Sequence, residues 1–412
     1  MTRTLYVSYD GVLEPLGESQ VVAYLEYLSK QSHITLVSFE KKQDLAETRF
    51  LEEMRSRLAG WGIDWIPLRY HKQPLVASTM YDVLRGLAVG IAVTKARGIQ
   101  LVHARGYVAS LIALALKRLF GARFLFDMRG FWADEKVDAG HWSKTSLVYR
   151  ITKGWEQRFF ESADGIVSLT ETGVEAIASL GYRIRVGVPI DVIPTCADLE
   201  RFTPGRKDAA LVSRFNLGDR VVIGCAGTMS NWYLREPMLA CLSYLACRID
   251  RAMILLVTQE DHEQMRIDAE RAGIKPHQLV LTRAPFAAMP EYLRLMDVGL
   301  FFIKPCFSKK GSSATKLGEF LATGVPVIIN DGVGDSGWIV RRHNVGVVLP
   351  GVRTTDFETA ARELERLLAD LLTSRRCRET AERYFDLKEG VERYRCLYAT
   401  LVSGSAQEPR LN

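Results

Sequence analysis

A lysine and a glutamate in the second half of the chain, Lys316 and Glu319, have types and spacing that could bind a nucleotide. Residues three apart share one face of a helix. The hydroxyls of Ser312, Ser313 and Thr315 precede them and could cap the start of that helix. Free amides and the macrodipole at a helix N-terminus favour an anion, and Lys316 adds positive charge there. The sequence therefore predicts a phosphate beside these residues and a ribose diol on the carboxylate.

An ordinary surface ion pair is the alternative for this lysine and glutamate, and such a pair contributes only roughly 0.2–0.5 kcal/mol. The surrounding stretch, 304–330, lowers the weight of that interpretation. It predicts a polar loop, a short helix with Leu317 and Phe320 on its apolar stripe, and a glycine end at Gly324. Residues 325–329 then indicate a buried strand of a parallel sheet.

Residues 316–327 resemble the donor-binding segment of retaining glycosyltransferases of family 4, which have the two-domain GT-B fold. In that family the run Lys-x-x-Glu-[Phe/Tyr]-Leu-Ala-x-Gly-x-Pro-Val closes over a sugar nucleotide, and this chain matches each fixed position. The resemblance implies that Glu319 holds the ribose and Lys316 a phosphate. Many members carry an earlier glutamate that contacts the donor sugar. Gly311 occupies that position here, so this role does not carry over.

Length and composition exclude several classes of protein. The chain has 412 residues, which is too long for one ordinary core and predicts two domains. With 48% hydrophobic and 25% charged residues it has the composition of a soluble globular protein, and no apolar run is typical of a membrane span or signal peptide. Seven scattered cysteines indicate reduced thiols, no metal site and a cytoplasmic protein. The net charge of +6 suits an anionic ligand or membrane surface and does not require nucleic acid.

The first residues predict the opening βα unit of a nucleotide-binding fold. Residues 4–9 form a β-rich run, a loop with Gly17 follows, and 21–28 are helical. By the family resemblance, Gly17 approaches the donor phosphates, and Glu18 and Ser19 approach the acceptor. An ordinary turn is an equally good interpretation of the loop. The loop lacks the G-x-G-x-x-G fingerprint, which argues against a nicotinamide cofactor.

Two further strand ends carry groups that could do chemistry. His103 and Arg105 end one strand, and Asp127, Arg129 and Trp132 follow the next. Asp127 could act as a base or stabilise positive charge at a sugar carbon. Arg129 could hold a phosphate, or pair with Asp127 or Asp134. His103 could equally be structural. Family members often place a histidine after the second strand; the loose match here is to members with Arg-Asp-Leu-Trp-Pro-Glu, which leaves open whether Asp127 replaces that histidine.

Two helical segments of the first half carry cations among apolar residues. They are 81–99 and 141–160. Each could lie on a bilayer, as amphipathic basic helices do, and 141–160 could instead form an acceptor surface. Each could also be an ordinary helix with one face on the sheet and one in solvent, which is the commoner case.

Residues 192–204 indicate the boundary between the domains. They resemble the family's junction, Ile-Pro-Asn-Gly-Val-Asp-Leu-x-x-Phe-x-Pro, with Thr-Cys in place of Asn-Gly. We expect an N-terminal acceptor-binding domain over 1–195 and a nucleotide-sugar-binding domain over 205–383. A helix over 384–403 would return to the first domain.

The second domain opens with a strand over 221–225 and a loop that starts at Gly227. Family members follow this glycine with an arginine and place a lysine five residues later; Thr228 and Tyr233 stand there instead. Lys316 is the first-ranked replacement. The predicted donor contacts are Gly17, Gly227, Thr228, Asn231, Arg235, Arg283, Phe286, Lys304, Ser313, Thr315, Lys316 and Glu319.

Together these patterns predict an α/β protein of GT-B type, with two Rossmann-like domains whose parallel sheets face an interdomain cleft. The expected reaction is sugar transfer from a nucleotide diphosphate sugar, with UDP favoured, to a saccharide or lipid-linked acceptor hydroxyl. The resemblance implies retention and no metal or other cofactor, in surface polysaccharide synthesis at the inner face of the membrane with peripheral contact. Asp127, Arg129, Lys316 and Glu319 are the predicted catalytic residues, and Glu18, Ser19, His103, Arg105 and Trp132 the acceptor contacts.

Three other functions remain open from the sequence. A non-catalytic sugar-nucleotide or glycan-binding subunit would bind without turnover. A sugar-nucleotide epimerase would give product from the donor alone. A glycan phosphorylase would need a pyridoxal-binding lysine site, which the sequence does not show.

Overall fold

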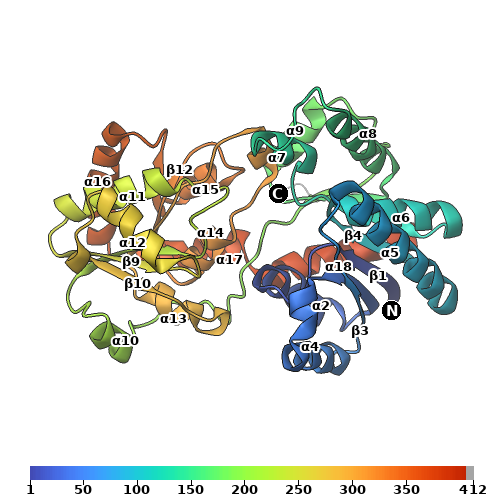
Figure 1. Cartoon of the computed structure of the whole chain (residues 1–412), viewed down its shortest axis with the longest axis horizontal. Helices are drawn as coiled ribbons and strands as arrows, with labels where there is room; N and C mark the ends of the chain where they lie inside the picture. The colour runs from blue at the N-terminus through green and yellow to red at the C-terminus, as the bar shows by residue number, and fades with distance from the viewer. Residues whose placement is uncertain (405–412) are drawn as a thin grey trace. The chain divides into compact units, whose positions relative to one another are not determined.

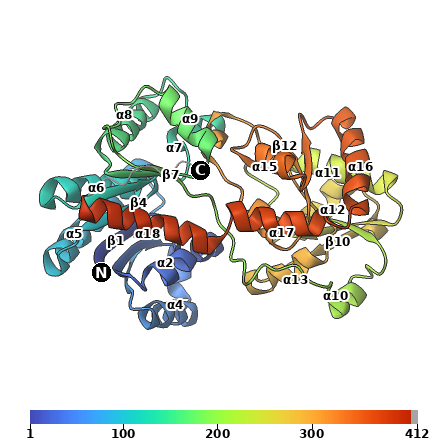
Figure 2. The ribbon, with the colours of Figure 1, turned by 180° about the vertical axis from the view of Figure 1, so that it is seen from behind.

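The structure, a computed structural model, describes residues 1–404, apart from the side chain of Leu75. The chain divides into two compact units. The first unit comprises Met1–Pro194 and the chain from Leu387 onward, and the second comprises Thr195–Asp386. Figure 1 and Figure 2 show each unit as a sheet with helices packed around it.

The first unit is built on seven parallel strands in the order β3-β2-β1-β4-β5-β6-β7. Almost every residue of the central strands is buried, because helical crossovers cover both faces of a parallel sheet. The register places Tyr6 beside His103 and Arg105 beside Asp127. The strands are β1 (Thr2–Ser8), β2 (Ser32–Glu40), β3 (Asp64–Arg69), β4 (Leu101–Arg105), β5 (Arg123–Asp127), β6 (Gly165–Ser168) and β7 (Ile190–Val192).

The helices of the first unit are α1 (Pro15–Gly17), the π-helix η1 (Glu18–Val22), α2 (Ala23–Leu28), α3 (Lys42–Ala46), α4 (Thr48–Gly60), α5 (Leu75–Arg97), α6 (Gly106–Phe120), α7 (Trp132–Asp138), α8 (Leu147–Ser162), α9 (Glu171–Ser179) and α18 (Leu387–Ser403). Glu47 leaves helical geometry and separates α3 from α4.

Helix α5 requires a correction. Its segment Val76–Arg97 is long and apolar enough to span a membrane and is only 33% buried, although the sequence predicted no such run. Asp82 of this helix is nevertheless buried and accepts hydrogen bonds from the Tyr9 hydroxyl at 3.1 Å and the His71 amide at 2.9 Å. A Cβ at Gly86 would lie 2.6 Å from Ile112 Cδ1 of α6, so this face of α5 packs closely on α6. Helix α5 is therefore held in the domain by one face.

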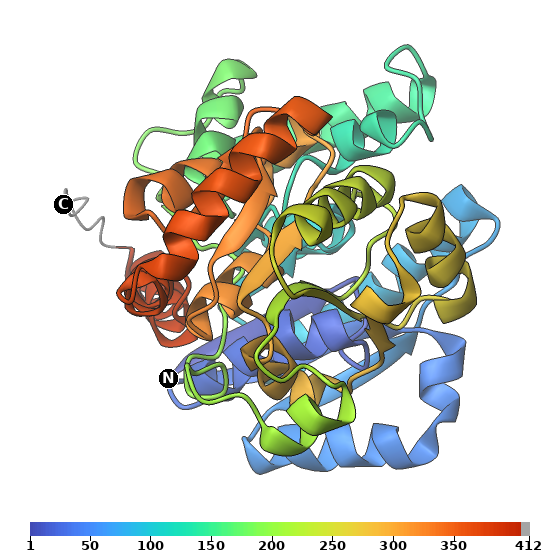
Figure 3. The same ribbon diagram turned by 90° about the vertical axis from the view of Figure 1, so that its left-hand side faces the viewer.

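The second unit is built on six parallel strands in the order β10-β9-β8-β11-β12-β13, with helices on both faces of the sheet (Figure 3). The strands are β8 (Val221–Ala226), β9 (Ala252–Val257), β10 (Leu279–Thr282), β11 (Val298–Phe301), β12 (Val327–Asn330) and β13 (Gly346–Leu349). The α-helices are α10 (Ala209–Arg214), α11 (Arg235–Arg248), α12 (His262–Arg271), α13 (Met289–Arg294), α14 (Thr315–Ala322), α15 (Ser336–His343), α16 (Thr354–Ala369) and α17 (Thr373–Tyr384). Three 3-10 helices, η2 (Pro276–Gln278), η3 (Phe286–Ala288) and η4 (Phe307–Gly311), lie in its loops.

Helix α14 is fixed on the sheet by its apolar stripe. Leu317 and Phe320 are buried, and the space for the Phe320 ring exists because Gly299 of β11 has no side chain. A Cβ at Gly299 would lie 2.6 Å from that ring. The helix ends before Gly324, whose φ of 77° is left-handed, as a C-terminal glycine allows. The predicted loop, helix and strand therefore form as the sequence indicates.

The helix predicted over 384–403 corresponds to α18, and a further helix, α17, precedes it. Helix α17 ends at Tyr384, and α18 begins at Leu387. Between them the Phe385 carbonyl accepts from the Ala197 amide at 2.8 Å. Helix α18 then packs on α2, β1 and β4 of the first unit. The predicted fold class, two Rossmann-like domains with parallel sheets and a last helix that returns to the first, is confirmed.

Candidate functional site

The start of α14 has no side-chain cap. Its N-cap residue is Ala314, which makes no side-chain capping hydrogen bond. The prediction that serine or threonine caps this helix is wrong, because Ser313 is engaged elsewhere: the Thr195 hydroxyl donates to the Ser313 carbonyl at 3.1 Å and lies 3.0 Å from its hydroxyl. The positive end of the α14 dipole is thus left to an external acceptor.

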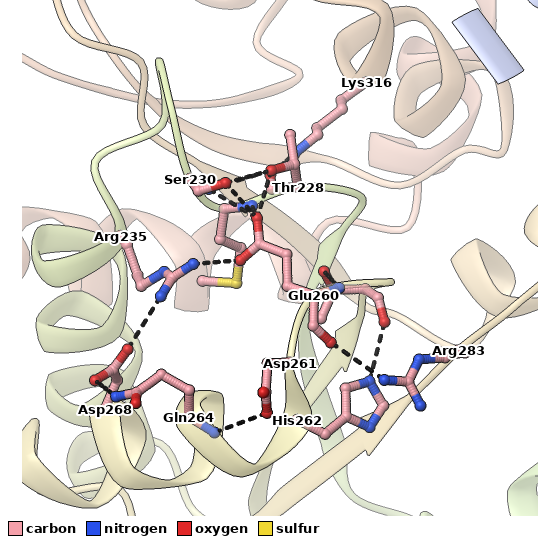
Figure 4. Close-up of polar contacts among 12 residues, drawn as sticks. Thr228, Ser230, Arg235, Glu260, Asp261, His262, Gln264, Asp268, Arg283 and Lys316 are labelled. Atoms are coloured by element: carbon pink, nitrogen blue, oxygen red, sulfur yellow. Dashed lines mark hydrogen bonds and ion pairs between the residues drawn. The ribbon is translucent and has the colours of Figure 1, made fainter. Parts of the chain in front are cut away.

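Lys316, in the first turn of α14, reaches the loop that follows β8 (Figure 4). Its ammonium donates to the Thr228 carbonyl at 2.6 Å and lies 3.6 Å from the centroid of the Tyr233 ring. The loop comes this close because Gly227 has a left-handed φ of 80°, and a Cβ there would lie 3.2 Å from Lys316 Cε. Burial lowers the pKa of Lys316 to about 8. Tyr233, at the family's lysine position, therefore supports the lysine that α14 supplies.

Glu319, one turn further along α14, does not pair with Lys316. In the part of the chain that the structure describes, no hydrogen bond or ion pair engages its carboxylate, so the surface ion-pair alternative is wrong. Burial raises the pKa of Glu319 to about 7, against the opposing effect of the Lys316 and Arg201 charges. A half-buried carboxylate with open acceptor sites could take the hydroxyls of a diol.

Glu260 fixes the loop that Lys316 contacts, and sequence reasoning missed it. Its Oε1 accepts from the amides of Met229 and Ser230, each at 3.0 Å, and from the Ser230 hydroxyl at 2.7 Å (Figure 4). Burial alone would raise the pKa of Glu260, but hydrogen bonds from Thr228, Ser230 and the Met229 amide outweigh it and lower the pKa to about 2. The available signal was an acidic residue just past the end of a buried strand, β9.

Several predicted donor contacts have partners of their own. Arg235 pairs with Glu260 and, at 3.1 Å, with Asp268 (Figure 4). Arg283 is exposed, and its guanidinium donates weakly to the Glu260 carbonyl at 3.4 Å.

The remaining predicted donor contacts are less closely tied to Lys316. Arg201 stacks on Phe286 at 3.9 Å. Asn231 and Lys304 are exposed, and Asn231 has a left-handed φ of 61°. Around Lys316 the structure therefore brings together Gly227 and Thr228, and the donor roles of the other residues stay predictions.

Asp127, in the first unit, is completely buried at the centre of a polar cluster. Its Oδ2 accepts from the Tyr394 hydroxyl at 3.1 Å and lies 3.4 Å from His103 Nε2. The guanidinium groups of Arg105 and Arg129 are each 3.8 Å from the carboxylate. Burial raises the pKa of Asp127, but these cations and His103 outweigh it, so the pKa is lowered overall.

His103 is buried in the same cluster, which ties α18 to the sheet. Its Nδ1 lies 2.7 Å from the Tyr398 hydroxyl, and burial lowers the pKa of the ring. Tyr394 and Tyr398 both belong to α18, so Asp127 and His103 each bind this helix to the sheet. This structural role is sufficient to explain why Asp127 and His103 are present. We therefore assign no chemical step to Asp127 or Arg129, whose catalytic roles stay predictions.

The segment 17–19 is also explained by internal contacts. A Cβ at Gly17 would lie 2.0 Å from the Gly11 carbonyl, so the backbone approach requires glycine. Glu18 pairs with Arg57 at 2.7 Å, and the Ser19 hydroxyl donates to the Leu16 carbonyl at 3.3 Å. Their predicted phosphate and acceptor contacts stay predictions.

Trp132, the last predicted acceptor contact, lines a cavity of about 640 Å³ in the first unit. Its ring packs against Tyr107 and Trp142. Over the described residues, no group of three or more His, Cys, Asp and Glu side chains is placed to hold a metal ion.

Comparisons with known proteins agree with this architecture. Residues 21–196 match the family model described as a glycosyl transferase 4-like domain. A search of curated protein sequences gave no match. The fold is that of GT-B glycosyltransferases, and three solved structures illustrate the likeness.

Sucrose-phosphate synthase from Thermosynechococcus elongatus is 15% identical, with a TM-score of 0.71 over 98% of this chain and 100% of that one. Anabaena Alr3699/HepE, solved with UDP and glucose, is 13% identical, with a TM-score of 0.70 over 97% and 100%. WaaG, a glycosyltransferase involved in lipopolysaccharide biosynthesis, is 12% identical, with a TM-score of 0.69 over 98% and 100%. The predicted resemblance to family 4 is confirmed over residues 21–196, and the motif at 316–327 lies outside that match.

Proposed function

We propose that this chain, which carries a glycosyl transferase 4-like domain over residues 21–196 within a GT-B fold, transfers a sugar from a UDP-sugar to an acceptor hydroxyl. The observation that supports this most is the arrangement at the start of α14. An uncapped helix N-terminus, the Lys316 ammonium and the open Glu319 carboxylate lie within one and a half helical turns of one chain segment. These three groups match the diphosphate and ribose of one nucleotide.

The α14 amides and Lys316 would act on the leaving diphosphate. Negative charge grows on that group as the bond to the sugar breaks, and donors fixed before the reaction stabilise it without reorganisation. The lysine uses one of its three N–H donors on the Thr228 carbonyl and also faces the Tyr233 ring, which leaves a donor for a phosphate oxygen. Glu319 would hold the ribose hydroxyls and so set the position of the diphosphate.

The finer features of the proposal come from the resemblance and from the neighbours. Retention and independence of metal are typical of the family 4 enzymes that the sequence resembles. UDP is the nucleotide in the HepE structure. WaaG's role in lipopolysaccharide synthesis supports a surface polysaccharide or lipid-linked acceptor. Work on such an acceptor would take place in the cytoplasm at the inner face of the membrane, with peripheral contact.

A ligand panel tests the donor site. Isothermal titration of UDP, GDP and ADP should show tight binding of one nucleotide, with UDP expected. Lys316→Ala and Glu319→Ala should each weaken that binding by about tenfold or more, since each removes a charged hydrogen-bonding partner. Glu358→Ala is the matched control, because Glu358 is an exposed glutamate on α16. Folded protein that binds none of the three nucleotides would exclude the donor site.

Product analysis separates the alternatives. A transferase yields UDP and a glycosylated acceptor, whose anomeric configuration by NMR tests retention, and activity in EDTA tests metal independence. A new sugar nucleotide formed from the donor alone would instead identify an epimerase. Binding without turnover across an acceptor panel would favour the non-catalytic subunit.

A further inference from the structure

The cavity in the first unit is an apolar groove between helices. Its walls include Met80 and Val83 of α5, Trp132 of α7, Ile151 and Trp155 of α8, and Trp142 between these last two helices. A volume of about 640 Å³ is in the range of sites that take a whole small molecule. The lining is thus suited to hydrocarbon.

The mouth of this groove exposes large apolar side chains on both helices. Of the lining residues, Val76 and Met80 on α5 are 68% and 56% exposed, and Ile151 on α8 is 52% exposed. Leu147, one helical turn before Ile151, is 71% exposed and lies outside the lining. Tyr81 and Leu84 extend the same apolar surface along α5, which is only one third buried despite its apolar composition. Single exposed apolar residues are ordinary, but a gathered set beside an apolar groove marks a binding surface.

The inner end of the groove is polar and lies at the ends of strands. Tyr9 and Asp10 follow β1, Lys41 follows β2, and Tyr70 follows β3, and all four line the groove. The carboxyl ends of parallel strands are where ligands bind in such sheets. A ligand that fills the groove would therefore present a polar end to this edge and an apolar end to α5 and α8.

Lys136 is the lining cation that could bind a phosphate on that ligand, because the other charged lining residues are Lys41, which is paired, and the acidic Asp10 and Glu14. Lys41 is paired with Glu14 at 2.8 Å. Lys136, which also lines the groove, lies 5.8 Å from the centroid of the Trp132 ring, and its ammonium makes no ion pair within the described chain. Helix α8 adds the exposed cations Arg150 and Arg158 beside its exposed apolar residues. Cations interleaved with an apolar rim are typical of surfaces that take anionic lipids.

From these observations we propose that the groove between α5 and α8 binds the hydrocarbon chain of a phosphate-linked lipid that carries the acceptor sugar. This inference rests on the proposed function and names the class of its acceptor. The sugar lies toward the strand ends, the phosphate near Lys136, and the chain between the two helices. The exposed residues of α5 and α8 then become the lipid's cover.

A brominated amphiphile tests the groove directly, because bromine quenches nearby tryptophans and Trp132, Trp142 and Trp155 line the cavity. The full-length protein is titrated with 11-bromoundecyl phosphate below its micelle concentration. We expect saturable quenching with one site. In a series of unbranched alkyl phosphates, affinity should rise by up to about fourfold per methylene until the groove is full and then level off.

Variants at the mouth decide whether the groove is the site. Ile151→Glu changes a residue that is already half exposed, so the fold tolerates it, and it should weaken binding by about tenfold or more. Leu119→Glu on α6 is the matched control, since Leu119 is 60% exposed and lies outside the groove lining. Lys136→Met should weaken binding of the phosphate probe and leave binding of undecyl glucoside, which is neutral, unchanged.

The outcomes separate this inference from the donor site and from plain membrane docking. The absence of quenching, or quenching that Ile151→Glu leaves intact, would exclude the groove as the lipid site. UDP titration of the same protein reports on the donor site independently. Quenching in a protein that binds no nucleotide overturns the acceptor role. The third outcome is plain membrane docking. The protein would then sediment with vesicles of equimolar phosphatidylcholine and phosphatidylglycerol, Leu84→Glu would abolish this sedimentation, and the monomeric amphiphile would not bind. That result would show a bilayer-docking face and overturn the proposal.

Discussion

At the scale of single residues, the candidate donor site depends on two groups whose protonation is shifted toward neutrality. Burial raises the pKa of Glu319 to about 7 and lowers that of Lys316 to about 8. The site needs the glutamate ionised, to accept from hydroxyls, and the lysine protonated, to hold phosphate. Both conditions hold together only between these two values in the free protein.

The affinity for a UDP-sugar should therefore depend on pH as a bell. Below about pH 7 Glu319 takes up a proton and loses acceptor strength, and above about pH 8 Lys316 loses its charge. Titration calorimetry with UDP-glucose measures this, because its diphosphate diester does not ionise in that range. Lys316→Arg should abolish the alkaline limb, since arginine stays protonated, and Glu319→Gln should abolish the acidic limb. An acidic limb that persists in Glu319→Gln would assign it to another group.

At the scale of elements, the local patterns were sufficient for α14 and insufficient for its surroundings. The 3.6-residue spacing of Leu317, Phe320 and Leu321 and the glycine at 324 predicted the helix and its end, because these signals act within a few residues. The helix cap was predicted wrongly because Ser313 hydrogen-bonds with Thr195, which is 118 residues away in the sequence. Glu260 was missed for the same reason, since its partners at 228–230 lie on another strand's loop.

The strand ends of the first unit show the same limit. The sequence placed His103 and Asp127 at neighbouring strand ends, and the sheet register sets β4 beside β5 as that expectation requires. What the sequence could not show is that two tyrosines of α18 cover them, Tyr398 being 295 residues after His103 and Tyr394 267 residues after Asp127. This burial depends on tertiary packing, which local sequence patterns do not encode. It supports a structural role for His103 and Asp127 better than a catalytic one.

The polar cluster should accordingly act on stability. Asp127→Asn leaves Arg105 and Arg129 buried without their counter-charge, which should lower the free energy of unfolding of the first unit by about 3 kcal/mol. Tyr398→Phe, which only removes a hydrogen bond to His103, should cost about 1 kcal/mol. Urea unfolding followed by tryptophan fluorescence measures both. Unchanged unfolding of Asp127→Asn with lost turnover would instead support the catalytic role predicted from the sequence.

At the scale of the whole molecule, the chain crosses between its units twice, at Pro194–Thr195 and at Asp386–Leu387. The second unit is continuous in sequence, whereas the first is completed only by the last helix. The first unit thus depends on α18, and the second unit contains α14 with Lys316 and Glu319 within 195–386. The two proposed activities therefore belong to different units: donor binding to the second and lipid binding to the first.

A chain that stops at Asp386 should therefore keep one activity and lose the other. Without α18 the first unit loses the packing of Leu387, Val391 and Leu401 and exposes the Asp127 cluster, so its unfolding should shift to markedly lower temperature. The second unit keeps α14, Lys316 and Glu319.

In scanning calorimetry, UDP at a hundred times its dissociation constant should still stabilise that unit by about 2.7 kcal/mol. The alkyl phosphate should no longer quench tryptophan. The full-length chain with Glu392→Gln, a change at an exposed ion pair on α18, serves as the control for altering this helix without removing it. A truncated chain that melts like the full one would show that α18 is dispensable to the first unit, while one that no longer binds UDP would show that the donor site depends on more than the second unit.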